Sequence, residues 1–387
     1  MYNILTLNKI SKKGLNEFGS DYQYGDNIEN PDAVLVRSTS MHEMEFPGNL
    51  AAIARAGAGV NNIPVDRCSE KGIVVFNTPG ANANAVKELV LMGLFLSSRK
   101  IVPGLSFVSS LKGKGDEVAK MTEKGKSAFA GPEVLGKKLG VIGLGAIGIL
   151  VANAATQLGM KVYGYDPYIS VDAAWGLSSS VTHAHSLDMI FSECDYITIH
   201  VPLTPDTKEM INQESISKMK DGVRILNYSR ANLVNAADIV SATQSGKVSC
   251  YVTDFPTDEI LGVEGIVVLP HLGASTPESE DNCAFMAAHE IIDYLENGNI
   301  VNSVNLPNIS MTREGRTRLC VLHKNVPNMI SAISSVLSAN GINIENMQSK
   351  SRNDYAYAMF DVSSDISDAV FSNIVSIEGV VRIRVIQ

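Results

Sequence analysis

Short runs of β-branched and other apolar residues alternate with helical stretches through the first two-thirds of the chain. This alternation is expected of parallel strands that are joined by helical crossovers. The predicted strands include residues 33–37, 73–77, 138–142, 161–165, 196–200, 224–227 and 266–269. The predicted helices include residues 83–98, 147–158 and 236–245. The pattern therefore predicts an α/β fold built on parallel sheets.

The C-terminal part of the chain follows a different order. A proline flanked by asparagines at 305–308 follows a long helical pattern at 279–296 and indicates a domain boundary. Residues 317–387 then read strand, helix, strand, strand, helix, strand, which is the order of a ferredoxin-like α+β module. Residues 112–131 are rich in Lys and Gly and show little periodicity, so we expect an exposed excursion or oligomer arm there.

Length and charge limit the functional classes. The 387 residues exceed one ordinary core, and a prior of roughly 150 residues per domain predicts two or three domains. No apolar run approaches the ~20 residues that a membrane span requires. A formal net charge of −9 argues against a nucleic-acid binder, because phosphate-backbone affinity depends on many Lys and Arg contacts. The first residues read as a strand and not as a signal peptide, so we expect a cytoplasmic protein.

The cysteines indicate neither a disulfide framework nor a metal site. They are odd in number, widely spaced and without a C-x-x-C pair. We expect them to be small buried hydrophobic residues in a reducing compartment. They are Cys68, Cys194, Cys250, Cys283 and Cys320.

A glycine-rich turn stands between a predicted strand and a predicted helix. Gly143, Gly145 and Gly148 form G-x-G-x-x-G, a pattern that is weak evidence alone. In this position it permits a tight turn, a close backbone approach to a pyrophosphate and close packing of helix on strand. Asp166 ends the next predicted strand about 20 residues downstream, where a carboxylate binds the ribose hydroxyls and repels a 2′-phosphate. These residues predict an NAD site and disfavour NADP.

Three polar residues follow predicted strands farther along the chain, in the order Arg230, Glu259 and His271. An Arg at a strand end of a doubly wound sheet can hold a carboxylate and polarise an adjacent carbonyl. Hydride transfer from an alcohol needs a base for the hydroxyl proton, and a His held by a carboxylate suits that task. Residue chemistry alone leaves a surface Arg and a structural His as alternatives.

The order of these features favours catalytic roles for Arg230 and His271 over those alternatives. A glycine fingerprint, then an Asp, then Arg, Glu and His resembles the D-2-hydroxyacid dehydrogenase family over roughly residues 30–305. By this resemblance Arg230 binds the substrate carboxylate and carbonyl oxygen, His271 is the acid–base group, and Glu259 orients it. Asp254 would contact the nicotinamide amide. The remaining predicted cofactor-binding residues are Ala146, Ile147, Tyr228, Ser229 and Gly273.

The resemblance also implies a domain organisation. A discontinuous flavodoxin-like substrate domain would comprise residues 1–95 and 276–305, and a doubly wound Rossmann-type NAD domain would comprise residues 96–275. The C-terminal module would comprise residues 316–387. One departure is Ala231, where the family usually has Gly, so we expect the turn after Arg230 to differ slightly.

The substrate is expected to carry a phosphate. The stretch at 77–86 and the segment at 36–38 resemble the substrate loop and anion-binding strand end of members that act on a phosphorylated hydroxy acid. Such a substrate requires donors beyond Arg230. The predicted substrate-binding residues are Arg37, Ser38 and Asn82 for the phosphate, and Gly59, whose backbone would lie close to the substrate carboxylate. A surface ion pair for Arg37 and an ordinary turn role for Asn82 are the alternatives.

The C-terminal module resembles an ACT regulatory domain, which binds amino acids at paired interfaces. The resemblance implies L-serine as an effector, with His323, Asn325 and Asn343 as its binding residues, and a homodimer or homotetramer. Asn328 stands where such loops usually carry Gly, but Asn tolerates left-handed dihedrals better than most residues. A purely structural dimerisation module is the alternative.

Two other functions stay open at this point. One is another NAD-dependent 2-hydroxyacid dehydrogenase, acting on glyoxylate, hydroxypyruvate or 2-oxoglutarate. The other is a redox-sensing NAD-binding protein that has the fold without turnover. The presence of Arg230, Glu259 and His271 disfavours the second.

Overall fold

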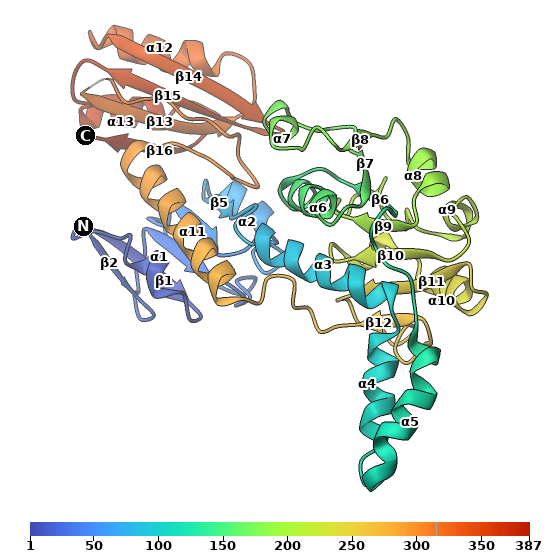
Figure 1. The fold of residues 1–387 in the computed structure, drawn as a ribbon. Coiled ribbons are helices and arrows are strands. Elements are labelled where there is room, and N and C mark those ends of the chain that lie inside the picture. Colours follow the sequence, from blue (N-terminus) through green and yellow to red (C-terminus); the bar gives the residue numbers. More distant parts are fainter. Residues whose placement is uncertain (315) are drawn as a thin grey trace. The chain divides into compact units, whose positions relative to one another are not determined.

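The computed structural model describes residues 1–314 and 316–387 (Figure 1). The chain divides into two compact units. The first unit comprises Met1–Asn82 and Pro277–Gln387, and the second unit comprises Ala83–Thr276. Helix α3 (Ala83–Ser98), which the expected domain limits assign largely to the substrate domain, belongs to the second unit, because Val86, Val90 and Leu94 lie in the core of that unit.

The first unit contains a parallel five-stranded sheet in the order β2-β1-β3-β4-β5. This is the flavodoxin-like strand order. Helix α11 (Pro277–Asn297) packs on the sheet through Ala284, Ala287 and Ile291, and short helix α1 (Lys12–Leu15) approaches α11 so closely at Gly14 that a side chain there would overlap Ala284. The remaining elements are β1 (Tyr2–Leu7), β2 (Tyr22–Gly25), β3 (Ala33–Val36), β4 (Ala52–Arg55), α2 (Val65–Glu70) and β5 (Val74–Asn77).

The second unit contains a parallel seven-stranded sheet in the order β12-β11-β10-β9-β6-β7-β8. Counted from β6, the first six strands have the order 3-2-1-4-5-6 of a doubly wound dinucleotide-binding fold, as expected from the sequence. The strands are β6 (Lys138–Ile142), β7 (Lys161–Tyr165), β8 (Thr182–His183), β9 (Tyr196–Ile199), β10 (Val223–Asn227), β11 (Val248–Thr253) and β12 (Ile266–Val268). In addition to α3, the helices between these strands are α6 (Ala146–Gln157), α7 (Val171–Trp175), α8 (Leu187–Glu193), α9 (Gln213–Ser217) and α10 (Ala236–Gln244).

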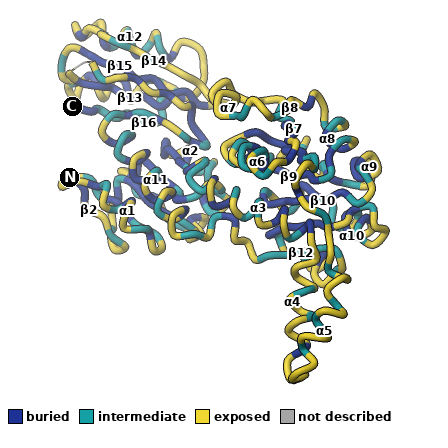
Figure 2. The backbone as a smooth tube through the Cα atoms, viewed as in Figure 1, coloured by how far each residue is buried: buried dark blue, intermediate teal, exposed yellow. Residues whose placement is uncertain are grey.

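An arm formed by residues 101–129 extends from the second unit and is mostly exposed (Figure 2). The expectation of an exposed excursion at 112–131 is confirmed, but the low periodicity concealed a helix, α5 (Val118–Gly125), which follows α4 (Ile101–Ser110). An aromatic contact joins the first and last parts of the arm's sequence, with the ring centroids of Phe107 and Phe129 5.3 Å apart. Among the described residues no single helix is long and apolar enough to cross a membrane, although α3 and α4 together, bent by 68°, match such a segment by length and composition alone.

The C-terminal module, residues 317–387, is an antiparallel sheet in the order β14-β15-β13-β16 with two helices. This ferredoxin-like arrangement agrees with the sequence expectation. Leu319, Ile333 and Phe360 belong to a separate core between sheet and helices. The elements are β13 (Thr317–Lys324), α12 (Met329–Ala339), β14 (Ile344–Arg352), β15 (Tyr355–Val362), α13 (Asp368–Val375) and β16 (Val380–Ile386).

Candidate active site

Three glycines shape the turn between β6 and α6. Gly143 adopts φ 92°, and a Cβ there would stand 2.5 Å from the carbonyl oxygen of His200. A Cβ on Gly148 would overlap the carbonyl oxygen of Gly143, whereas a Cβ on Gly145 would meet nothing within 4 Å. The first and third glycines are therefore required by packing, and the second leaves open space at the start of α6. Ala146 and Ile147 form the first turn of that helix, whose free N–H groups favour an anion.

Asp166 is fixed beside this turn at the end of β7. Its carboxylate accepts hydrogen bonds from Leu144 N at 2.9 Å and from Tyr168 N at 2.8 Å. Each oxygen keeps a lone pair, because a carboxylate offers about four acceptor sites. The residues present therefore fit a dinucleotide, with its pyrophosphate at the start of α6 and its ribose hydroxyls at Asp166.

Arg230 follows β10 in a loop that Asn227 holds in place. The Asn227 side chain donates to the carbonyl oxygen of Arg230 at 2.9 Å and accepts from Ser229 N at 3.2 Å, and Ser229 Oγ donates to Ile199 O at 2.9 Å. Ala231 begins a short 3-10 turn without a positive φ, so the absence of the family's Gly is accommodated. Arg230 is exposed, and no carboxylate of the described residues lies within 4.0 Å of its guanidinium group. Its Nη1 donates to Ser229 O at 2.7 Å, and the remaining N–H donors of the guanidinium group are available for an anionic ligand.

Asp254 follows β11, the neighbouring strand, and is buried. Its Oδ2 accepts from Gly273 N at 3.2 Å, while Oδ1 has no partner in the structure. Burial raises the pKa of Asp254, and the nearby charge of His271 opposes that shift. A buried carboxylate oxygen without a donor is suited to accept from an amide NH₂, as expected for the nicotinamide amide.

His271 is exposed and lies on the same loop as Gly273, between β12 and α11. Its ring meets that of Phe255 edge-on, with the centroids 5.0 Å apart at 87°. Within the described residues no hydrogen bond joins Glu259 to His271, and Glu259 accepts from Thr257 Oγ1 at 3.4 Å. The orienting role of Glu259 stays a prediction, since catalytic hydrogen bonds are often long in unliganded structures.

Tyr228 occupies a different place from the other predicted cofactor residues. Its side chain is buried against α3, where Gly93 leaves room for the ring. Burial and the neighbouring Asp254 carboxylate raise the pKa of Tyr228. Only the backbone of Tyr228 therefore stands at the strand end.

The predicted substrate residues lie in the first unit. Arg37 follows β3 and forms an ion pair with Glu280 on α11 at 2.8 Å, with both side chains partly exposed. Ser38 N donates to the Asn8 side chain at 2.9 Å. Gly59 lies in the loop after β4, and Asn82 directly precedes α3. Arg37 thus already has a carboxylate partner, which a phosphate would have to replace.

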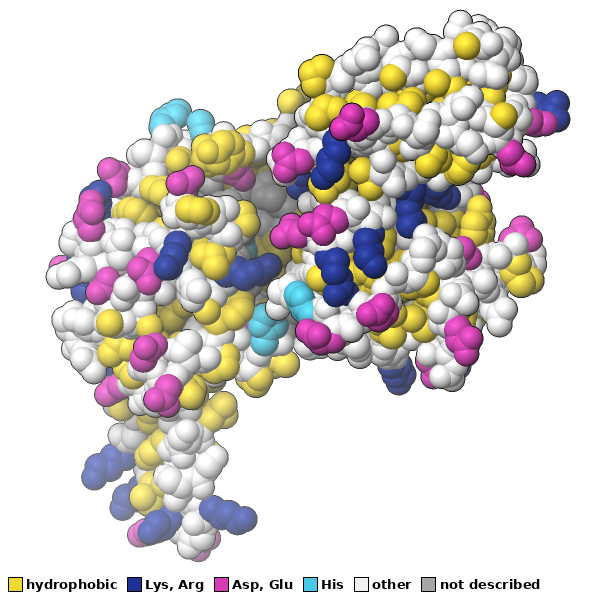
Figure 3. Space-filling model, turned by 180° about the vertical axis from the view of Figure 1, so that it is seen from behind, with side chains coloured by type: hydrophobic (Ala, Val, Ile, Leu, Met, Phe, Trp, Pro, Cys, Tyr) yellow, Lys and Arg dark blue, Asp and Glu magenta, His cyan; other side chains and the backbone are white. Residues whose placement is uncertain are grey.

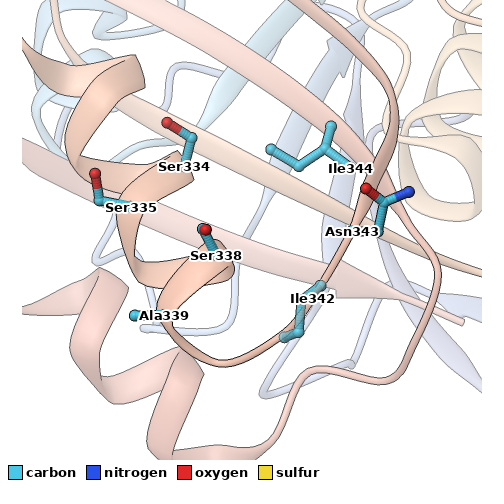
Figure 4. Close-up of a pocket in the computed structure, with 7 residues that line it drawn as sticks. All are labelled: Ser334, Ser335, Ser338, Ala339, Ile342, Asn343 and Ile344. Atoms are coloured by element: carbon cyan, nitrogen blue, oxygen red, sulfur yellow. The ribbon is translucent and has the colours of Figure 1, made fainter.

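The C-terminal module places the predicted effector residues in two different cavities. His323 and Asn325 line a cavity of about 420 Å³ together with Met329 and Ser331 at the start of α12. Asn343 instead lines a separate cavity of about 590 Å³ with Ser334 and Ser338 of α12 (Figure 4). Within one chain Asn343, in the turn between α12 and β14, thus lies apart from His323 and Asn325, and their shared role in effector binding stays a prediction. Asn328 adopts φ 71°, so its predicted left-handed conformation is confirmed.

Two residues that shape the site were not predicted from the sequence. Asn227 folds the Arg230 loop, and an Asn at a strand end is a recognisable turn signal. His200 follows β9 beside Gly143, and its Nε2 lies 3.0 Å from Thr198 Oγ1. Burial lowers the pKa of His200 to about 4, so the ring beside the glycine turn is neutral.

The comparisons with known proteins agree with this geometry. A sequence profile described as D-isomer specific 2-hydroxyacid dehydrogenase, NAD binding domain, matches residues 105–273. The D-3-phosphoglycerate dehydrogenase of Haemophilus influenzae is 30% identical over 355 residues, which is 89% of this chain and 83% of that protein. The chain belongs to the D-isomer specific 2-hydroxyacid dehydrogenases. Its second unit is accordingly the NAD-binding domain of the family.

Other members of this dehydrogenase family differ in their length and named activity. The hydroxypyruvate reductase of Thermotoga maritima is 40% identical over 265 residues, covering 65% of this chain and 81% of that protein. The D-3-phosphoglycerate dehydrogenase of Synechocystis sp. is 35% identical over 300 residues, and the chain spans only 52% of its length. A structure of NAD⁺-bound 3-phosphoglycerate dehydrogenase from Entamoeba histolytica is 27% identical with a TM-score of 0.61, covering 79% of this chain and 98% of that one.

Proposed function

We propose that this dehydrogenase oxidises D-3-phosphoglycerate to 3-phosphohydroxypyruvate with NAD, a reaction of L-serine biosynthesis. The observation that carries the proposal is the exposed Arg230, which has no carboxylate partner among the described residues, after the strand next to that of buried Asp254, with His271 on the loop that Asp254 holds. The phosphoglycerate dehydrogenase of Haemophilus influenzae, which aligns over 89% of the chain, supports this substrate.

In the proposed reaction Arg230 holds the substrate carboxylate and the C2 oxygen with its guanidinium fork. NAD bound at the glycine turn would supply the acceptor for the hydride from C2. His271 accepts the hydroxyl proton as the C2–O bond becomes a carbonyl, and Glu259 stabilises the imidazolium that results. The Asp254 Oδ1 that lacks a partner would accept a hydrogen bond from the amide of the nicotinamide.

The phosphate of the substrate is assigned to the first unit. Its proposed donors are Arg37 and Ser38, which follow β3, and Asn82, which precedes α3, while the backbone at Gly59, after β4, is assigned to the substrate carboxylate. Arg37 can pass from Glu280 to a phosphate because their pair is partly exposed, and exposed pairs contribute only about 0–1 kcal/mol.

A kinetic comparison tests the substrate. We expect kcat/KM for D-3-phosphoglycerate to exceed that for D-glycerate by at least about 100-fold, since a phosphate contributes several charge-assisted hydrogen bonds. Arg37→Gln should reduce that preference and leave the rate with D-glycerate unchanged. Comparable rates for both substrates would reject the assignment of a phosphate site.

A second experiment tests the role of His271. His271→Gln should lower kcat by roughly 100- to 10,000-fold, the usual contribution of general acid–base catalysis, while the Kd of NADH stays within about twofold. His289→Gln is the matched control, because His289 is exposed and pairs with Glu17. Equal losses of turnover and NADH binding in His271→Gln would reject the proton-accepting role.

Reduction of hydroxypyruvate is the second candidate activity. The 40% identity to the hydroxypyruvate reductase of Thermotoga maritima favours it. The same substrate panel distinguishes the two activities when hydroxypyruvate and glyoxylate are included in the reducing direction. A higher kcat/KM for hydroxypyruvate than for its phosphorylated form would select this alternative.

We also propose that L-serine binds the cavity around His323 and inhibits the enzyme. The His323 Nδ1–H donates to Lys324 O at 2.8 Å, which leaves buried Nε2 as an acceptor without a partner. An amino group can donate to this nitrogen, and the free N–H groups at the start of α12 can bind a carboxylate. Calorimetry should show millimolar or tighter serine binding that Asn325→Ala weakens and Asn343→Ala does not. Equal effects of the two variants would reject this cavity.

The arm at 101–129 supports the proposal of a homodimer or homotetramer. Exposed apolar side chains lie along α4, and charged side chains gather toward the tip of the arm (Figure 3). Leu105, which is 65% exposed, is the most exposed of them. Light scattering should show a smaller species for Leu105→Lys than for the unmodified protein.

The five buried, unpaired cysteines support the proposed cytoplasmic location.

A further inference from the structure

Three arginines on one face of the C-terminal sheet contact the rest of the first unit. Arg318 lies on β13, and Arg382 and Arg384 lie on β16, where they pair in register with Leu322 and Cys320. Residues two apart share a face of a strand, so the three guanidinium groups extend to the same side. This side also carries contacts to α11, because Arg318 Nη1 donates to Asn297 O at 2.8 Å.

Only one of these arginines has a counter-charge. Arg318 forms an ion pair with Asp361, and both side chains are fully buried. Within the described residues no carboxylate lies within 4.0 Å of Arg382 or Arg384. Burial lowers the pKa of Arg382, and the charge of Arg384 lowers it further. The face therefore carries two partly buried positive charges without an ionic partner.

Backbone carbonyls satisfy some of the N–H donors but do not neutralise the charge. Arg382 donates to Leu50 O at 2.5 Å and to Gly48 O at 2.9 Å. Arg384 donates to Tyr294 O and Leu295 O at 2.7 and 2.8 Å, at the last turn of α11. The negative end of a helix offsets part of the Arg384 charge, so Arg382 is the less compensated of the two. Buried charge without a partner is costly, and an anion from solution would reduce that cost.

A cavity of about 310 Å³ adjoins both groups and is lined also by Tyr2, Asp32 and Asn49. The Asp32 Oδ2 accepts a hydrogen bond from Asn3 N at 2.8 Å. Because the lining contains two arginines and one aspartate, its net charge is positive. Each guanidinium group has five N–H donors and uses two on carbonyls, so donors remain on both. We propose that this cavity, named here the Arg382 pocket, binds a phosphate group.

Binding there would strengthen the contact between the C-terminal module and the parallel sheet. Arg382 holds the turn before β4 and Arg384 holds the end of α11, so a phosphate that bridges them joins three segments of the first unit. The phosphate can come from inorganic phosphate or from a phosphate monoester such as the proposed substrate. The two sources share the same fork-to-oxygen chemistry.

Calorimetry with inorganic phosphate, in chloride buffer at fixed ionic strength, tests the pocket. The unmodified protein should bind two phosphates per chain if the Arg37 site also accepts one. Arg382→Gln should weaken one binding event at least tenfold and leave the other unchanged. Arg316→Gln is the control, because Arg316 lies in the same module but is exposed and paired with Asp365. Equal phosphate binding by Arg382→Gln and Arg316→Gln would overturn the proposal.

Two further titrations distinguish the two sources of phosphate and the two binding sites. Arg37→Gln should abolish the other binding event only, so an unchanged Arg37→Gln titration would count against the proposed substrate site and not against the Arg382 pocket. Titrations of Arg37→Gln with D-3-phosphoglycerate and with D-glycerate then show whether the Arg382 pocket accepts a monoester. D-Glycerate binding as tight as that of its phosphate would overturn phosphate recognition.

A measurement on the unmodified protein covers the case in which Arg382→Gln does not fold. Phosphate should slow amide hydrogen exchange at least threefold in β16 and in the turn at 48–51, relative to chloride at equal ionic strength. The same comparison in α13, which lies away from β16's arginine face, should show no change. Exchange in β16 that does not respond to phosphate would overturn the proposal.

Discussion

Arg318 and Asp361 form a two-pronged ion pair, with Nε 2.6 Å from Oδ1 and Nη2 2.8 Å from Oδ2, and both side chains are fully buried. Arg318 Nη1 also donates to Met311 O at 2.9 Å, and Asp361 Oδ2 accepts from Glu314 N at 3.0 Å. The pair therefore connects the sheet of the C-terminal module to the segment that leads into it. Since both charges are removed from water, each is stabilised mainly by the opposite charge of its partner.

Asp361→Asn should consequently destabilise the protein strongly. The substitution leaves the Arg318 charge buried without a counter-charge, which typically costs about 3–5 kcal/mol. Asp365→Asn is the matched control, because the Arg316–Asp365 pair is exposed and such pairs contribute about 0–1 kcal/mol. Urea denaturation measures both free energies of unfolding. Similar losses in the two variants would show that burial of the Arg318–Asp361 pair is not what makes it important.

The glycine turn allows packing to be separated from cofactor binding. Gly148→Ala should lower both the stability and the NADH affinity, because its Cβ would overlap the Gly143 carbonyl oxygen. Gly145→Ala should keep the melting temperature within about 2 °C and still weaken NADH binding at least tenfold, since its Cβ would enter the space of the pyrophosphate. Thermal unfolding and NADH fluorescence distinguish the two. An unchanged NADH affinity in Gly145→Ala would contradict the placement of the pyrophosphate.

The Asp166 carboxylate should determine the choice between NAD and NADP. Asp166→Asn keeps an oxygen that can accept from Leu144 N or Tyr168 N, but it removes the charge that repels a 2′-phosphate. We expect the ratio of kcat/KM for NAD to that for NADP to fall by about 10- to 100-fold, which corresponds to roughly 1.4–2.8 kcal/mol. Asp172→Asn, on exposed α7, is the control. Equal ratios in the two variants would remove Asp166 from cofactor selection.

Local patterns predicted most of the elements, because strand and helix periodicity is a property of neighbouring residues. The glycine turn and Asp166 were predictable for the same reason, since their spacing along the chain sets their geometry. The left-handed Asn328 was also expected, because the backbone preference of Asn is intrinsic. These features need no knowledge of what packs against them.

Features that depend on distant segments were not predictable in this way. Glu280 is the partner of Arg37 only because α11 returns to the first unit after the whole second unit. Asn343 is placed in its own cavity by the length of α12, which separates the two ends of the helix. Tyr228 has its hydroxyl buried because Gly93 on α3 leaves room for it. Each outcome depends on tertiary contacts that override the local pattern.

Glu290 should make stability depend on pH. This residue of α11 is buried, its Oε1 accepts from Asn302 Nδ2 at 2.8 Å, and its Oε2 has no partner. Burial raises the pKa of Glu290 to about 8, against a value of 4.5 for the free side chain. Between these values the folded state holds a proton that the unfolded state has released. The free energy of unfolding should therefore be highest below about pH 4.5 and fall as the pH rises through 8.

Glu290→Gln should remove this dependence, because the amide keeps the acceptor for Asn302 and cannot titrate. From pH 5 to pH 8.5 the unmodified protein should lose roughly 2–4 kcal/mol more of its unfolding free energy than the variant does, at about 1.4 kcal/mol per pKa unit. Glu278→Gln, at the exposed start of the same helix, is the control and should follow the unmodified protein. Urea denaturation at several pH values measures the difference. A Glu290→Gln variant whose stability falls as steeply as that of Glu278→Gln would mean that the Glu290 carboxyl ionises in the folded state as readily as in water.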